Sequence, residues 1–310
     1  LLWPDRFDEQ ARQSLRQTLS TLRKAIERAE ADAIDALAAR GMLFQNAFTV
    51  TPVCSTSRSS FMTGMHAQTI GAHNHRSNRD GGHPLPEGVR LLTDWLREAG
   101  YFTALIGKWH CGEWLKEHLP MQQGFMHQYG HYAWGIDYYT KTIEHNAPAR
   151  FAVYDWHRNG EAIWEEGYAT DLFADEAVRV IGKQSEDKPF FLYMPLYSPH
   201  TPIVPSSTFQ GKSPFGKYGD FVMETDWVVG QVMKALDAAG CGGNTLLLFS
   251  TDNGTSPEAK FEQLESHGID LHHHFRGHKG QIYEGGHRVP FVARWPGKIQ
   301  AGATCEETVC

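Results

Sequence analysis

The sequence predicts an α/β fold in which a mostly parallel central sheet is covered by helices on both faces. Three features of the chain indicate this class. Its 310 residues are enough for one large core, 41% of them are hydrophobic, and short apolar runs alternate with segments of helical periodicity. Strands that alternate with helices in this way are typical of a parallel sheet with helices packed on it.

The alternating segments can be placed one by one along the chain. Apolar residues recur at helical spacing between Leu15 and Ile26, so residues 9–39 predict one long or two shorter amphipathic helices. Residues 265–288, rich in His and Gly, are expected to form a long irregular loop, and loops of that length are usually functional. Strands are expected at residues 101–106, 190–195, 245–250 and 290–295, and helices at residues 91–99, 170–183 and 221–239.

Composition excludes several classes of function. The formal net charge of −7 argues against a nucleic-acid partner, which would require a basic face. No apolar run is long enough to span a membrane. The five cysteines are odd in number and have no metal-type spacing, so they predict neither a disulfide framework nor a zinc ribbon and leave the compartment open. The chain starts at Leu1 without a signal peptide, and we expect it to be incomplete at both ends.

The stretch PVCSTSRSSFMTG at residues 52–64 places one cysteine before a run of hydroxyl residues. Ser55, Thr56 and Ser57 are residue types that cap a helix start, so a helix is expected to begin there and to continue through Arg58. Cys54 would then lie at the positive end of that helix, where anions bind. The pattern alone leaves open a buried thiol, half of a disulfide, or a reacting group.

Polar residues follow three of the predicted strands. The clusters are Gly107-Lys108-Trp109-His110, Ser198-Pro199-His200-Thr201-Pro202 and Thr251-Asp252-Asn253-Gly254. Lys108 and His110 would point the same way in extended backbone. Taken singly, each cluster could be a solvated charge or an ordinary turn. Because ligands bind outside the carboxyl ends of the strands in open α/β sheets, the three together predict a binding site at that edge.

These motifs resemble the type I, formylglycine-dependent sulfatase family of the alkaline phosphatase superfamily. The first stretch is similar to that family's C-x-P-S-R signature, GKWHCG to its G-K-W-H-x-G, and SPHTP and STDNG to two further family stretches. GHKGQIYEGGHRVPFVARWPG resembles the segment G-K-G-x-x-Y-E-G-G-x-R-V-P. The resemblance covers residues 34–310, which it implies to be a partial catalytic domain, with the family's C-terminal domain beyond it. The helical segment at residues 1–33 has no clear counterpart in the family.

The resemblance also implies catalytic roles for individual residues. Cys54 would be oxidised by a formylglycine-generating enzyme to formylglycine (3-oxoalanine), whose hydrated aldehyde attacks sulfur. Arg58 would hold its hydroxyl, and His110 would hydrogen-bond to it. Sulfate oxygens would be bound by Lys108, His200 and Lys279, and His200 would protonate the leaving alcohol. His75 is a candidate for substrate binding, with a solvated loop as the alternative.

Calcium is the cofactor that the resemblance implies. Asp252 and Asn253 match family ligands of a divalent cation, and residue 54 would be a third ligand. The family's opening strand ends in an Asp-Asp pair that also binds the metal, and nothing here matches it, because no apolar strand precedes Asp5 or Asp8. Because this Asp-Asp pair is missing, we expect weak calcium binding by this chain and an Asp-Asp strand in a longer natural form. In a separate departure from the family, Thr56 stands where the signature carries proline.

The predicted function is hydrolysis of a sulfate monoester, with a sulfated carbohydrate as the expected substrate class. One alternative is a phosphonate or phosphodiester hydrolase of the same superfamily. Another is a catalytically inactive homologue, because the Asp-Asp pair is absent. The sequence leaves localisation unknown, and the resemblance implies a periplasmic or secreted protein. His272, His273, His274 and His278 could suggest a transition-metal site, but without a carboxylate or cysteine they are better interpreted as a loop lining the substrate pocket.

Overall fold

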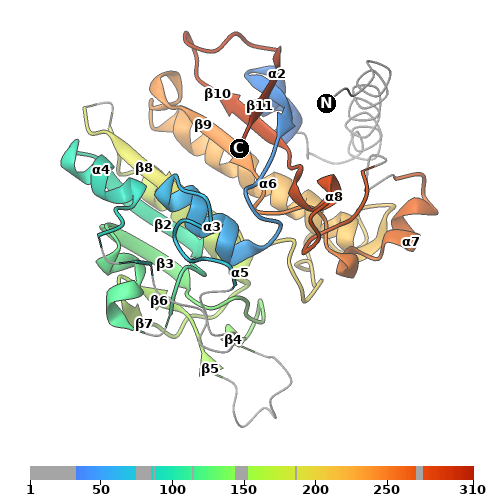
Figure 1. The fold of residues 1–310 in the computed structure, drawn as a ribbon, viewed down its shortest axis with the longest axis horizontal. Coiled ribbons are helices and arrows are strands. Elements are labelled where there is room, and N and C mark those ends of the chain that lie inside the picture. The colour runs from blue at the N-terminus through green and yellow to red at the C-terminus, as the bar shows by residue number, and fades with distance from the viewer. Residues whose placement is uncertain are drawn as a thin grey trace. The chain divides into compact units, whose positions relative to one another are not determined.

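A computed structural model describes residues 33–74, 85–86, 88–113, 115–143, 153–185, 187–269 and 275–310 (Figure 1). The described residues belong to two compact units. The first unit contains the described residues up to Pro52 together with Pro205–Gly230 and Gly243–Cys310. The second unit contains those of Val53–Val204 and Gln231–Gly242. Among the described residues, no helix has the length and apolar character needed to cross a membrane.

A four-stranded sheet forms the centre of the first unit. Its order is β11 (Ala303–Val309), β1 (Met42–Ala47), β10 (Phe291–Arg294) and β9 (Leu247–Ser250). Strands β1 and β11 are parallel, whereas β10 is antiparallel to both of its neighbours. Helix α2 (Ala33–Ala39) packs on β1 and β10, and its first two backbone N–H groups donate to the Asp226 carboxylate at 3.0 and 2.8 Å. A carboxylate at this position complements the positive end of the helix.

The second unit contains a five-stranded sheet. Its order is β7 (Glu161–Ala162), β6 (His157–Arg158), β3 (His127–His131), β2 (Phe102–Lys108) and β8 (Phe190–Tyr193). Strand β2 is parallel to β3 and β8, and β6 is antiparallel to β3 and β7. Helices α4 (Leu92–Glu98) and α5 (Ala169–Ile181) pack against β2. The carboxyl ends of the three parallel strands therefore lie at one edge of this sheet.

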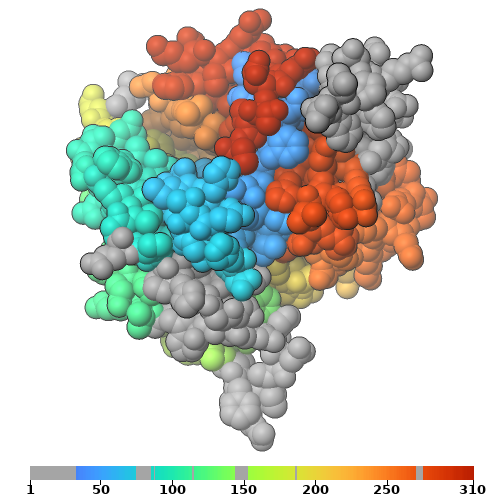
Figure 2. Space-filling view, in the orientation of Figure 1, coloured from blue at the N-terminus to red at the C-terminus, as the bar shows by residue number. Residues whose placement is uncertain are grey.

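Of the remaining α-helices and strands in the described part of the chain, only α6 has residues in both units. Helix α6 (Gly216–Ala238) begins in the first unit and ends in the second. The other α-helices and strands are α3 (Cys54–Thr63), α7 (Phe261–Glu265), α8 (Glu284–His287), β4 (Thr142–Ile143) and β5 (Val153–Tyr154). Short 3₁₀ helices lie at Lys116–His118, Pro120–Gln122, Gly242–Asn244 and Pro257–Ala259. In the space-filling view, the light-blue segment around α3 reaches the surface (Figure 2).

The structure confirms the seven predicted strands and helices between residues 91 and 295, with small shifts of their ends. The prediction of a mostly parallel sheet is wrong, because among the described strands only β1–β11, β2–β3 and β2–β8 pair in parallel. Strand β10 can pair antiparallel with β9 because the described part of their connection contains only short helices rather than a crossover helix. The predicted helices before Ala33 and the division at residues 33 and 34 lie outside what the structure tests.

Candidate active site

Cys54 is the first residue of α3 and is buried, so the expected position at the start of a helix is confirmed. The expected caps are wrong. Val53, in extended conformation, precedes the helix and makes no side-chain cap, while Ser55, Thr56 and Ser57 lie inside the first turns. The Thr56 hydroxyl donates to the Val53 carbonyl at 2.9 Å, a bond to the preceding turn that a threonine inside a helix can make. The helix therefore starts earlier than the hydroxyl pattern predicts, with Val53 rather than Ser55, Thr56 or Ser57 at the cap position.

Arg58 joins α3 to the end of β2. It lies four residues after Cys54 on the helix and is buried. Its Nη1 donates to the backbone carbonyl of Lys108 at 2.9 Å. Lys108 is the last residue of β2 and is also buried, at 1% exposure. Two buried cations next to a helix start form an environment that favours a bound anion.

The backbone that follows β2 is fixed by its neighbours. The N–H groups of Lys108 and His110 donate to the carbonyls of Pro195 and Tyr132, at 2.9 and 3.0 Å. His110 is buried and has a φ of +52°, so the extended backbone expected between Lys108 and His110 is wrong at His110. Trp109 is a packing residue, since it belongs to an apolar core cluster of this unit. The turn after β2 is thus held between the ends of β3 and β8.

Tyr197 connects several of the predicted catalytic residues. The Lys108 Nζ atom lies 5.5 Å from the centroid of its ring, and the His200 ring stacks on it with centroids 4.9 Å apart. Burial raises the pKa of the Tyr197 hydroxyl despite the opposing hydrogen bond to the Ile136 backbone, with smaller contributions from Cys54 and Asp137, so the hydroxyl stays neutral. No sequence pattern indicates this role, apart from the position of Tyr197 three residues before His200.

The sequence analysis did not identify two further carboxyl groups of this unit, those of Asp155 and Glu113. Asp155 accepts hydrogen bonds from the Tyr132 and Ala133 N–H groups, and it pairs with His157 Nε2 at 3.0 Å. Burial alone would raise the pKa of Asp155, but the His157 hydrogen bond, the charge of a nearby histidine and these backbone donors lower it overall. Burial and the Asp155 charge raise the pKa of Glu113 to about 7, against the opposing effect of Lys108.

The first unit holds the other predicted residues. Asp252 and Asn253 directly follow β9, as the sequence predicted. The Gly254 N–H donates to the Gly286 carbonyl at 2.9 Å, and the Lys279 N–H donates to the Thr255 carbonyl at 2.9 Å. A Cβ atom on Gly254 would lie 1.9 Å from the Gly285 oxygen, so only glycine permits this approach. These contacts place the Asp252–Asn253 turn beside the segment that carries Lys279.

The described donors do not complete a calcium site. Calcium takes about six to eight oxygen ligands, and Asp252 and Asn253 supply only part of that set. Within the described ranges, no group of three or more His, Cys, Asp or Glu side chains is arranged to hold a metal ion. The three predicted strands belong to two sheets rather than one, since β2 and β8 lie in the five-stranded sheet and β9 in the four-stranded sheet. That their polar clusters form one site stays a prediction. His75 and the histidines at positions 272–274 lie outside the described residues.

Comparison with known proteins shows the family of the chain. A family model described as Sulfatase matches residues 20–309. The chain therefore belongs to the sulfatase family, within the alkaline phosphatase superfamily. It is 32% identical over 285 residues to the human N-acetylgalactosamine-6-sulfatase, an alignment that covers 87% of this chain and 53% of the relative. It is 28% identical to an N-acetylgalactosamine-6-O-sulfatase of Bacteroides thetaiotaomicron, covering 86% of this chain and 63% of that protein.

Solved structures show the same fold. The crystal structure of Ps i-CgsB in complex with k-i-k-neocarrahexaose matches with a TM-score of 0.78 at 28% identity, over 90% of this chain and 63% of that one. The structure of BT4656 with D-glucosamine-2-N,6-O-disulfate matches with a TM-score of 0.65 at 18% identity, over 90% of this chain and 69% of that one. The chain spans about half the length of its human relative, 53%.

Proposed function

We propose that the protein hydrolyses a sulfate monoester on a sulfated carbohydrate, with a formylglycine made from Cys54 as its nucleophile. One observation carries the proposal: Cys54 begins α3, and Arg58 on the same helix is hydrogen-bonded at 2.9 Å to Lys108 at the end of β2. This bond, from Arg58 Nη1 to the Lys108 backbone carbonyl, holds the helix that carries the thiol and the guanidinium against the strand end that carries the Lys108 ammonium. Membership of the sulfatase family supports the same chemistry.

The chain's own residues would stabilise the negative charge of the reaction. The hydrated aldehyde would supply the attacking oxygen and a second hydroxyl from which sulfate is released by elimination. Arg58 and His110 would hold this group in place. Lys108 and Lys279 would bind sulfate oxygens, because positive groups arranged beforehand stabilise the charge of the transition state without further reorganisation. Asp252 and Asn253 would contribute oxygen ligands to calcium, but no step is assigned to the metal because the described donors are too few.

His200 is suited to protonate the leaving alcohol. Its Nδ1 lies 2.9 Å from the Thr201 carbonyl, an acceptor that fixes the proton on Nδ1 and leaves Nε2 to exchange a proton. Stacking on Tyr197 holds the ring in this orientation. As the bond from sulfur to the alcohol oxygen breaks, its electron pair would stay on that oxygen and take up the Nε2 proton.

The substrate class follows from the relatives. The human and Bacteroides relatives are named for the 6-sulfate of N-acetylgalactosamine, and Ps i-CgsB was solved with k-i-k-neocarrahexaose. We therefore take N-acetylgalactosamine 6-sulfate as the first substrate to examine. A formylglycine-generating enzyme is the partner required for maturation.

The test compares two chromogenic esters. The full-length protein, co-expressed with a formylglycine-generating enzyme, is expected to hydrolyse 4-nitrophenyl sulfate faster than bis(4-nitrophenyl) phosphate. A preference for the diester would favour the phosphodiesterase alternative. Binding of inorganic sulfate without hydrolysis of either ester would favour the inactive homologue. N-acetylgalactosamine 6-sulfate, followed by release of inorganic sulfate, then tests the carbohydrate class.

A further inference from the structure

A second histidine lies beside Lys108 at the same edge of the five-stranded sheet. His131 is the last residue of β3, and in the parallel pairing of β2 with β3 it is the register partner of Lys108. The Trp109 N–H donates to the His131 carbonyl at 2.9 Å, so the two strand ends are tied together. Register partners in a parallel pair project to the same face of the sheet. His131 and Lys108 therefore share one face.

Both side chains also contact the same aromatic ring. The His131 ring packs edge-on against Tyr197, with centroids 5.1 Å apart and an interplanar angle of 75°. Lys108 Nζ lies 5.5 Å from the centroid of that ring. On another side, His131 stacks against Phe173 at 6.4 Å. Its imidazole is thus enclosed by aromatic residues, with the Lys108 ammonium as a close cationic neighbour.

The His131 ring is completely buried, at 0% exposure, and neither nitrogen makes a hydrogen bond of normal geometry to any described residue. Leaving a buried polar atom unpaired is destabilising, and such atoms in native proteins are uncommon. An apolar residue between Tyr197 and Phe173 would avoid this cost. The unpaired imidazole therefore requires an explanation other than packing.

The imidazole is neutral at physiological pH. Burial, helped by the charges of Lys108 and Arg58, lowers the pKa of His131 to about 3, against the opposing effects of Asp155 and, least of all, the Ala133 backbone. A neutral imidazole carries one N–H and one lone pair. The lone pair can accept a hydrogen bond from an ammonium group, and it does so without adding charge to a site that already holds two cations.

We propose that His131 is a positioning residue for Lys108: its unprotonated ring nitrogen accepts one N–H of the ammonium when a sulfate ester binds, which directs the other N–H groups to the sulfate oxygens. The inference rests on the proposed function, because it presupposes that Lys108 binds sulfate. It assigns the unpaired nitrogen a partner on the same sheet face. It also explains why a polar ring lies at this strand end.

The experiment uses the full-length protein with His131→Phe and His131→Gln, each in the natural background and combined with Lys108→Ala. Inorganic sulfate binding is measured by calorimetry, and kcat/KM is measured with 4-nitrophenyl sulfate. His131→Phe is expected to weaken sulfate binding about tenfold, as the loss of one hydrogen bond to a charged group predicts, without lowering the melting temperature. His131→Gln, which keeps an acceptor, should recover most of the affinity. In the Lys108→Ala background, His131→Phe should have no further effect.

Three outcomes would overturn the inference: unchanged sulfate affinity in His131→Phe, equal losses in the Phe and Gln variants, or an equally large loss when Lys108 is already alanine. If His131→Phe does not fold, His131→Leu replaces it, and failure of both apolar variants to fold would show that the ring is a structural core residue. If the unaltered protein neither binds sulfate nor hydrolyses the ester, the proposed function fails and this inference fails with it. If it does both and His131→Phe matches it, only the inference fails.

Discussion

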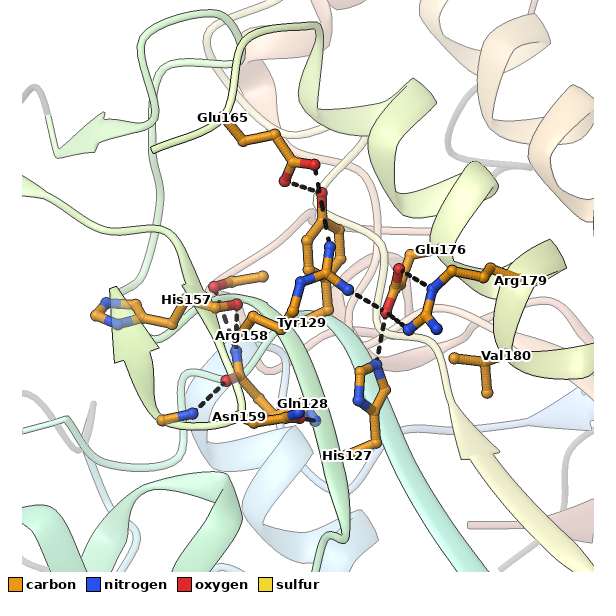
Figure 3. A network of polar contacts seen from close by, with 12 residues as sticks. His127, Gln128, Tyr129, His157, Arg158, Asn159, Glu165, Glu176, Arg179 and Val180 are labelled. Atoms are coloured by element: carbon orange, nitrogen blue, oxygen red, sulfur yellow. Dashed lines mark hydrogen bonds and ion pairs between the residues drawn. The ribbon is translucent and has the colours of Figure 1, made fainter. Parts of the chain in front are cut away.

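The two ends of strand β3 carry buried histidines in opposite situations. At the first position, His127 Nε2 donates to the Glu176 carboxylate at 2.7 Å, and Figure 3 shows this pair within a network of polar contacts. At the last position, His131 has no hydrogen bond of normal geometry among the described residues. The imidazole of His127 is therefore paired with a carboxylate at one end of the strand, whereas the imidazole of His131 at the other end can still accept a hydrogen bond.

The network at the first end is saturated around Glu176. Its carboxylate accepts from Arg158 Nη1 at 2.7 Å and from Arg179 Nε at 2.8 Å, in addition to His127. Next to it, the Tyr129 hydroxyl donates to Glu165 (Figure 3). A buried network with all its members paired makes a local structure rigid and has no capacity for a ligand. The polar network around Glu176 therefore holds the start of β3 in place, whereas a role in catalysis is expected at its end.

The largest effect is expected at the functional end. Lys108→Ala should reduce kcat/KM for a sulfate ester by about a hundredfold to a thousandfold, the range found when one charge-stabilising group is removed. The melting temperature should change little in comparison. Steady-state kinetics and thermal unfolding on the same preparations test this. Lys183→Ala, an exposed lysine just after α5, is the matched control. Equal kcat/KM values in the Lys108→Ala and Lys183→Ala variants would contradict a catalytic role for Lys108.

The opposite pattern is expected at the structural end. Glu176→Ala leaves His127 and Arg158 without their buried partner and should lower the free energy of unfolding by about 3–5 kcal/mol. The kcat/KM of the folded fraction should stay close to that of the unaltered protein. Glu176→Gln, which keeps a hydrogen-bond acceptor, should cost less. Denaturant unfolding with active-site titration measures both quantities, and a variant that is stable but inactive would contradict the assignment.

A smaller effect is expected on the pH dependence of stability, because the Glu176 carboxylate is charged in the folded protein. Burial alone would raise its pKa, but the hydrogen bonds from Arg179, His127 and Arg158 hold it well below the ordinary range. A depressed carboxyl pKa stabilises the fold above the unfolded value of about 4.3, and this contribution is lost as the pH falls below it. Urea unfolding between pH 7 and pH 3 should therefore show a steeper loss of stability for the natural protein than for Glu176→Gln. Parallel curves would exclude this role.

The smallest effect is expected for calcium. Because Asp252 and Asn253 supply only part of the oxygen donors that calcium takes, the 310-residue chain should bind the ion weakly, and chelation should leave its melting temperature nearly unchanged. Calorimetric titration measures the affinity, with Asp252→Ala as the control. Tight stoichiometric binding that is lost in Asp252→Ala would show that further ligands complete the site.

Sequence patterns predicted the elements that have a clear apolar period and missed those that do not. Helices α4, α5 and α6 and strands β2, β8, β9 and β10 were expected from their hydrophobic runs. Strand β3 was not, because its sequence HQYGH is polar, and only the partners around it make its burial possible. Strand β11, with the sequence ATCEETV, is charged and mostly exposed, so its pairing with β1 left no apolar signal.

The candidate site was predictable only where residues lie in recognisable motifs. Cys54, Arg58, Lys108 and His200 could be proposed in this way. Tyr197, His131 and Asp155 could not, because their contribution depends on which side chains meet in space. A histidine at a strand end has no distinguishing feature in sequence, and only the lack of partners around its buried ring sets His131 apart from His127.

The central proposal is that Cys54 is converted to the nucleophile of a sulfatase. Its most direct test is the mass of the tryptic peptide that contains this residue, measured together with turnover of a sulfate ester. The full-length protein, co-expressed with a formylglycine-generating enzyme, should carry an aldehyde at position 54. It should hydrolyse the ester, whereas Cys54→Ser should lose multiple turnover, because a serine lacks the second hydroxyl needed to expel sulfate. An unmodified thiol at position 54 in a protein that still turns over the ester, or a Cys54→Ser variant as active as the natural protein, would contradict the account.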